Sequence, residues 1–129
     1  MEFSRLKILA IDDNRDNLIV LQALLGESLP ASICYTASDG ARGLELALRE
    51  DPDVILLDII MPEMNGFEVC RRIKADKELR DIPVVFLTAM GTNREHRIQA
   101  LEVGAEGFLG KPPDVQELEA QIKAMAKLK

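Results

Sequence analysis

Short apolar runs alternate along this chain with segments whose apolar residues recur at helical spacing. The five runs cover about residues 6–11, 32–37, 54–57, 84–87 and 108–109. They are apolar throughout rather than alternating between apolar and polar residues, which is typical of parallel strands buried on both faces of a sheet. The run at 32–37 is the least apolar, and we therefore expect it at an edge of the sheet.

The segments between these runs carry the marks of helices: a polar residue that caps the first turn, a stripe of apolar residues, or a Gly or Pro that ends the helix. The first predicted helix is 16–25, with Leu18, Leu21 and Leu25 on one face; the second is capped by Asp39 and ends before Pro52; and the third is marked by Phe67, Cys70 and Ile73. The fourth begins at the capping box of Thr92 and Glu95 and ends at Gly104. The last begins at Asp114 and Glu117, and its buried residues are Leu118, Ile122 and Met125.

The order of these elements defines the fold class. Strand-like runs that alternate with helices indicate βαβ units and a parallel sheet, and right-handed crossovers place helices on both of its faces. We therefore predict an α/β fold of the (βα)5 type. The 129 residues fit one domain, 1–129, and no linker, repeat or low-complexity stretch divides them.

Four of the five runs end on residues suited to phosphate or metal chemistry. Because the carboxyl ends of parallel strands meet at one edge of a sheet, ligands of open α/β folds bind there. Adjacent strands lie about 5 Å apart, so the side chains that follow them converge on one small site. The converging residues are Asp12 and Asp13 after the first run, Asp58 after the third, Thr88 after the fourth and Lys111 after the fifth.

Each of these residues alone has an ordinary explanation. An acidic pair after a strand is most often a helix cap or a solvated turn, threonine is common in strands, and a lysine is usually a surface residue. Together they fit Mg²⁺, which takes oxygen ligands and is commonly held by one or two carboxylates and a phosphate. Asp58 is a candidate nucleophile that would form an acyl phosphate. Thr88 and Lys111 would then contact the phosphoryl oxygens.

Charge and composition narrow the classes of partner. The net charge of −6 argues against nucleic-acid binding by this domain. No apolar run approaches the ~20 residues of a membrane span, and no signal sequence follows Met1. Cys34 and Cys70 lack metal-binding or redox spacing, so we expect buried thiols in a reducing compartment, the cytoplasm. His96, the only histidine, lies among charged residues and is expected on an exposed helix face.

Four stretches of the chain match a known family, in order and at domain-scale spacing. They are Ile11-Asp12-Asp13-Asn14, residues 57–66 (LDIIMPEMNG), Leu87-Thr88-Ala89 and residues 104–112 (GAEGFLGKP). Each stretch alone is weak, but the set is specific. Over nearly its whole length the chain resembles the receiver domain of two-component response regulators, which act in phosphorelay signal transduction. The resemblance implies a flavodoxin-like fold with strand order 2-1-3-4-5, in agreement with the (βα)5 prediction.

The resemblance also implies a role for each site residue. Asp58 would be the phosphoacceptor, and Thr88 and Lys111 would contact the phosphoryl group once it is attached. The donor would be a phosphohistidine on a sensor histidine kinase or a histidine phosphotransfer protein. The Lys111-Pro112 peptide is usually cis in the family. The Mg²⁺ ligands would be Asp12, Asp13, Asp58 and the backbone carbonyl of Ile60.

A conformational switch is implied as well. Thr88 would move toward the phosphoryl group, and Phe108, at the switch-aromatic position, would turn inward. The surface of the fourth helix, fifth strand and fifth helix would change in response, and the same surface is a possible homodimer interface. Such a domain is not a classical enzyme, although it catalyses its own phosphorylation and slow dephosphorylation.

Four positions depart from the family pattern or qualify it. Phe108 lacks the hydroxyl of the tyrosine often found there, and Pro113 replaces the apolar residue expected after Lys-Pro. Ile60 and Met90, two residues after Asp58 and Thr88, are apolar where water would approach a phosphoryl group. We hypothesise slow self-dephosphorylation for that reason.

Two other functions remain open at this point. A phosphatase of the haloacid dehalogenase type also uses an aspartate after its first strand. The motif of those enzymes at that site resembles Asp-x-Asp, whereas this chain has Asp12-Asp13-Asn14. A pseudo-receiver would keep the fold as a protein-interaction module without phosphorylation. No GxxxxGK[ST] motif is present, which excludes a P-loop enzyme. Because the last predicted helix finishes near Lys129, the chain is expected to be either a stand-alone receiver or a piece of a hybrid kinase or longer regulator.

Overall fold

Five parallel strands form one sheet in the computed structural model, which describes residues 6–89 and 94–128. The strand order is β2-β1-β3-β4-β5, as predicted, with β2 at an edge. The elements in chain order are β1 (Lys7–Ile11), α1 (Arg15–Ser28), β2 (Ile33–Ala37), α2 (Gly40–Glu50), β3 (Val54–Leu57), α3 (Gly66–Ala75), β4 (Val84–Thr88), α4 (Arg94–Glu102), β5 (Gly107–Gly110) and α5 (Val115–Ala126).

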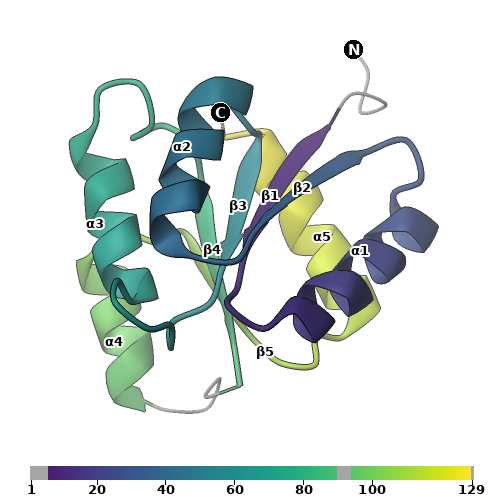
Figure 1. The fold of residues 1–129 in the computed structure, drawn as a ribbon. Coiled ribbons are helices and arrows are strands. Elements are labelled where there is room, and N and C mark those ends of the chain that lie inside the picture. Colours follow the sequence, from purple (N-terminus) through teal and green to yellow (C-terminus); the bar gives the residue numbers. More distant parts are fainter. Residues whose placement is uncertain (1–5, 90–93, 129) are drawn as a thin grey trace.

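Helices cover both faces of the sheet, as predicted. In Figure 1, α1 and α5 lie on one face, and α2, α3 and α4 lie on the other. Successive strand residues point to opposite faces, so each strand contributes to two cores. On β1, Leu9 and Ile11 pack under α2, α3 and α4, whereas Ile8 and Ala10 pack under α1 and α5. Burial on both faces explains why the strands are apolar throughout.

Helix starts follow the capping residues of the sequence. Asp39 accepts the backbone N–H of Arg42 at 2.7 Å, and Asp114 accepts that of Glu117 at 3.0 Å, so both predicted caps are confirmed. The predicted bounds of α1 were too narrow. The helix is capped by Asn14 rather than beginning near residue 16, and it continues three residues beyond Leu25.

Two predictions concern residues that the structure does not describe. The capping box assigned to Thr92 and the water-blocking role assigned to Met90 fall on residues outside the described ranges. Gly104 has a φ of +93°, a conformation that suits glycine after the end of α4. Within 6–89 and 94–128, none of the helices has the length and apolar character needed to cross a membrane.

The prediction that His96 lies on an exposed helix face is wrong. His96 is half-buried rather than on an exposed face, and its ring packs edge-on against Phe67 at a centroid distance of 5.8 Å. The charged neighbours of His96 in the sequence did not indicate this contact, because one helical residue among them still faces α3.

The two cysteines are free: Cys70 is buried and Cys34 is half-buried. Burial raises the pKa of both thiols to about 11, which makes them poor nucleophiles.

One half-buried ion pair joins α3 to the amino ends of β4 and β5. The Lys74 ammonium lies 2.9 Å from Oε2 of Glu106 and also donates to the carbonyls of Arg80 and Ile82, at 3.2 and 2.9 Å. Oε1 of Glu106 accepts the backbone N–H of Val84 at 2.8 Å. This network therefore holds the strands at the end of the sheet opposite to Asp58.

Candidate functional site

The sequence-predicted site residues lie at the carboxyl edge of the sheet. Backbone hydrogen bonds continue the strand pairing beyond the strand ends, which fixes where the following side chains stand. The backbone N–H groups of Asp12, Asp58 and Lys111 donate to the carbonyls of Ala37, Ile11 and Thr88 at 3.1, 2.9 and 3.0 Å, respectively.

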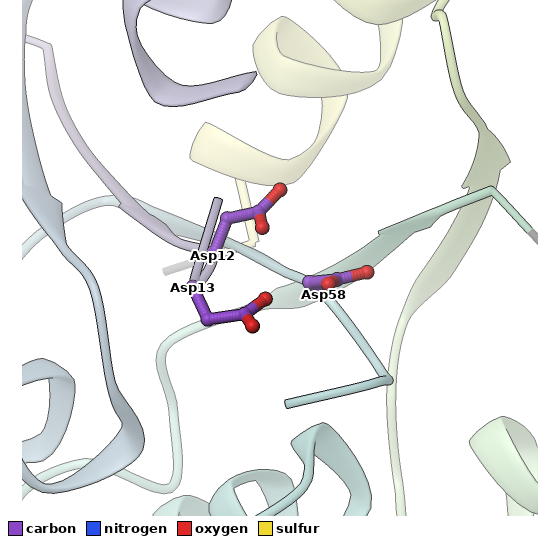
Figure 2. Close-up of side chains that lie close together, drawn as sticks. All are labelled: Asp12, Asp13 and Asp58. Atoms are coloured by element: carbon purple, nitrogen blue, oxygen red, sulfur yellow. The ribbon is translucent and has the colours of Figure 1, made fainter. Parts of the chain in front are cut away.

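Three carboxylates form a tight acidic cluster. One oxygen from each of Asp12, Asp13 and Asp58 lies within 4.8 Å of the others, and Figure 2 shows the three side chains close together. Asp12 and Asp58 are only 6% and 7% exposed, whereas Asp13 is exposed. Mg²⁺ holds oxygens at about 2.1 Å and thus sets opposed ligands about 4.2 Å apart. A small contraction of the cluster would therefore fit this cation.

Lys111 joins the cluster from the end of β5. Its ammonium pairs with Oδ2 of Asp12 and, at 3.5 Å, with Oδ1 of Asp58. Asp12 accepts two further hydrogen bonds. The backbone N–H of Asn14 donates to Oδ1 at 2.9 Å, and the side-chain amide of Asn17 donates to Oδ2 at 3.3 Å. One positive charge thus stands among three negative ones, which leaves the cluster with a net negative charge that attracts a cation.

Burial raises the pKa of the Asp58 carboxyl above its ordinary value. The Lys111 ammonium lowers this pKa, and the negative charge of Asp12 raises it. The Lys111 ammonium therefore compensates the buried negative charge of Asp58 only in part. A second cation beside Asp58 would favour the ionised carboxylate, which is the nucleophilic form.

The loop after Asp58 is closed by a glycine. The backbone N–H of Gly66 donates to the carbonyl of Ile59 at 2.8 Å, and a β-carbon at residue 66 would stand 2.1 Å from the carbonyl oxygen of Asp58. Only glycine permits this approach without a shift of the backbone. Ile60, in the same loop, is 59% exposed beside the cluster. The assignment of its carbonyl as a metal ligand stays a prediction.

Thr88 and Phe108 lie on neighbouring strands. Thr88 is 1% exposed at the end of β4, and Phe108 is half-buried on β5. The strand register pairs Phe86 with Phe108 and Thr88 with Gly110, so Thr88 and Phe108 are diagonal neighbours on one face of the sheet. The rings of Phe86 and Phe108 are 6.4 Å apart. A movement of Thr88 toward Asp58 would therefore change the space next to Phe108.

A largely apolar cavity of about 370 Å³ opens beside the cluster, between α1 and the loop that follows β5. The Lys111-Pro112 peptide in this loop is cis. The cavity thus places apolar surface directly beside charged site residues. Its lining consists of Asp12, Asn17, Val20, Leu21, Leu24, Leu87, Ala89, Lys111, Pro112 and Pro113.

A protein-family model described as the response regulator receiver domain matches residues 8–123. The chain belongs to this family. Response regulator PleD from Caulobacter vibrioides is 45% identical over 124 residues, which are 95% of this chain and 26% of PleD. The DNA-binding dual master transcriptional regulator RpaA from Synechocystis is 38% identical and is matched over 92% of this chain and 48% of RpaA. The receiver chain thus spans less than half the length of these two relatives.

Solved receiver structures share the fold. A putative response regulator from Chloroflexus aurantiacus superposes with a TM-score of 0.87 at 25% identity, over 95% of this chain and 98% of the other. The receiver domain of sensor histidine kinase PA1611 from Pseudomonas aeruginosa has a TM-score of 0.84 at 28% identity, with the same coverage. That structure contains a magnesium ion coordinated in its active-site cleft.

The residue patterns brought Asp12, Asp13, Asp58 and Lys111 together correctly, but they missed two neighbours. Asn17 was not singled out, although an amide one helical turn after an acidic pair is a signal that could have drawn attention to it. Gly66 was noted only as the last residue of the stretch 57–66, because its contact with the Asp58 carbonyl depends on the path of the loop in space.

Proposed function

We propose that this receiver is a phosphorylation-dependent signalling switch that accepts a phosphoryl group on Asp58. The cluster of Asp12, Asp13 and Asp58 with the Lys111 ammonium carries the proposal. It combines a buried carboxylate nucleophile with positive charge for phosphoryl oxygens and oxygen ligands for a divalent cation.

The reaction is a direct transfer. A carboxylate oxygen of Asp58 forms a bond to phosphorus while the bond between phosphorus and the donor's imidazole nitrogen breaks, and the electron pair stays on that nitrogen, which takes up a proton. Lys111 and Thr88 bind the oxygens of the transferred group. Phosphoryl transfer depends mainly on in-line positioning and charge neutralisation. Asp12, Asp13, Asp58 and the backbone carbonyl of Ile60 would hold Mg²⁺, which would supply part of that neutralisation.

Phosphorylation then changes the output surface. It adds about −1.5 to −2 charges and three acceptor oxygens at Asp58. Thr88 moves toward these oxygens, and Phe108 turns into the space that Thr88 leaves. Changing a two-state equilibrium from mostly off to mostly on takes about 5.5 kcal/mol of differential interaction. New charge-assisted hydrogen bonds to Lys111 and Thr88, in a partly buried site, are strong enough to supply most of it.

The proposed donor is a phosphohistidine on a sensor histidine kinase or a histidine phosphotransfer protein. The apolar cavity beside Asp12 and Lys111 offers such a protein a place to dock next to the phosphoacceptor. Three further parts of the proposal rest on the family rather than on this site. They are an output partner or attached output domain, a homodimer through α4, β5 and α5, and a cytoplasmic location.

We further propose that the phosphorylated state is long-lived. The exposed side chain of Ile60, near Asp58, offers an attacking water molecule no hydrogen-bonding partner. The side chain of Met90 is assigned the same effect from the sequence. The double variant Ile60→Asn with Met90→Glu should shorten the lifetime of the aspartyl phosphate. An unchanged lifetime would refute this part of the proposal.

Transfer from a protein donor tests the proposed function. A radiolabelled histidine phosphotransfer protein is mixed with wild type, with Asp58→Asn and with Lys111→Met. We expect rapid Mg²⁺-dependent labelling of wild type, none of Asp58→Asn and slow labelling of Lys111→Met. Stable binding of the donor protein without transfer to wild type would instead favour the pseudo-receiver.

A further inference from the structure

Three residues donate hydrogen bonds to the carboxylate of Asp12, and only Lys111 among them has a part in the proposed transfer. Oδ2 of Asp12 receives the Lys111 ammonium and the side-chain amide of Asn17, the latter at 3.3 Å. Oδ1 receives the backbone N–H of Asn14 at 2.9 Å. Asn17 is thus the only uncharged side chain among the described hydrogen-bond donors to Asp12.

Asn17 is itself fixed by the start of α1. It is the third residue of the helix, and its backbone N–H donates to the side chain of the capping residue Asn14 at 3.1 Å. In many helices the side chain at this position turns back to the capping backbone. Here the half-buried side chain of Asn17 reaches the end of β1 instead. The helix start and the Asp12 carboxylate are therefore positioned by the same residue.

The two side chains on Oδ2 of Asp12 differ in how they tolerate a cation. The Lys111 ammonium repels Mg²⁺ and, in the proposed function, leaves Asp12 for the phosphoryl group on Asp58. The amide of Asn17 is neutral and can keep its hydrogen bond while another lone pair of the carboxylate binds a metal. Outer partners of this kind orient metal-binding carboxylates and contribute to metal affinity.

We infer that Asn17 is a positioning residue, which holds Asp12 in its metal-binding orientation before and after Lys111 turns to the phosphoryl group. The inference deepens the proposed function and rests on it for the roles of Mg²⁺ and Lys111. Asn17 acts through Asp12 and touches neither the phosphoryl group nor its donor.

The test is the Mg²⁺ affinity of Asn17→Leu, measured by calorimetric titration on the whole chain. Leucine has a similar size and a higher helix propensity, but it cannot donate to Asp12. Gln22→Leu is the matched control, because Gln22 is a second amide on α1 whose side chain donates to the carbonyl of Cys34 at 3.2 Å. We expect the Kd for Mg²⁺ to rise about tenfold in Asn17→Leu and to stay within about twofold of wild type in Gln22→Leu.

A kinetic split gives the second readout. With acetyl phosphate as donor, Asn17→Leu should need about tenfold more Mg²⁺ for half-maximal phosphorylation, while its rate at saturating Mg²⁺ stays close to that of wild type. An unchanged Kd in Asn17→Leu, or an equal loss in both variants, would overturn the inference. If Asn17→Leu alone binds Mg²⁺ weakly but wild type accepts no phosphoryl group, the proposed function fails and the positioning role stands.

Discussion

Replacement of Gly66 by alanine should disturb the backbone that positions Asp58, the proposed phosphoacceptor. The added β-carbon would stand 2.1 Å from the carbonyl oxygen of Asp58 and 2.9 Å from Cα of Ile59. Both are backbone atoms, so no flexible side chain can move aside. Non-bonded heavy atoms are most favourable at about 3.5 Å or more, so α3 and the Asp58 loop must separate by more than about 1 Å.

The magnitude follows from two opposed terms. Overpacking of this kind costs about 1–3 kcal/mol, and the displacement also weakens the hydrogen bond from Gly66 to the Ile59 carbonyl. Alanine favours a helix over glycine by up to about 1 kcal/mol, which offsets only part of the loss. A displacement of about 1 Å at a reacting group slows a positioned reaction by about a hundredfold. We therefore expect Gly66→Ala to lose both stability and phosphorylation rate.

Urea unfolding and acetyl phosphate labelling measure the two effects. Gly26→Ala is the matched control, because Gly26 lies in α1 and a β-carbon there meets nothing within 4 Å. The control should be stabilised by about 0.5–1 kcal/mol and labelled at the wild-type rate. If Gly66→Ala proves as stable as Gly26→Ala and is labelled as fast, the steric reasoning is wrong.

Three further predictions concern charge. Because burial raises the pKa of Asp58 above the unfolded value of 3.8, the folded state retains a proton that the unfolded chain has released, and stability falls as pH rises through this interval. Without Mg²⁺, Asp58→Asn should therefore be more stable than wild type near neutral pH and lose this advantage in acid; equal urea midpoints at neutral pH would contradict it. Mg²⁺ at a hundred times its Kd should add about 2.7 kcal/mol of stability, and an increase in Tm that survives in Asp12→Asn would argue for a different site. Lys74→Met should cost about 1–3 kcal/mol in urea unfolding, more than the control Glu106→Gln, which keeps an acceptor for the backbone N–H of Val84; equal costs would show that the Lys74 contacts to backbone carbonyls contribute nothing.

The sequence predicted those parts of the fold that rest on burial and local capping. Strands buried on both faces gave continuous apolar runs, and the least apolar run became the edge strand β2. Asp39 and Asp114 capped helices as expected, because a cap depends only on residues three positions away. The far end of α1 was missed because its last turn, beyond Leu25, adds no buried apolar residue to the stripe.

The candidate site was predictable as a set of residues but not as a network of contacts. Strand ends determine that Asp12, Asp58 and Lys111 share an edge, since the register of a parallel sheet brings them there. The pairing of Lys111 with Asp12 and the reach of Asn17 depend on side-chain rotamers, which a sequence pattern does not encode. His96 was misplaced for a similar reason, because its contact with Phe67 depends on how α4 packs against α3.

Intact mass after incubation with acetyl phosphate tests the central claim most directly. Wild type and Asp58→Asn are compared with and without Mg²⁺, beside a receiver known to be labelled under the same conditions. The account predicts a gain of one phosphoryl group by wild type only, and only with Mg²⁺. No gain by wild type while the control receiver is labelled, or an equal gain by Asp58→Asn, would contradict it.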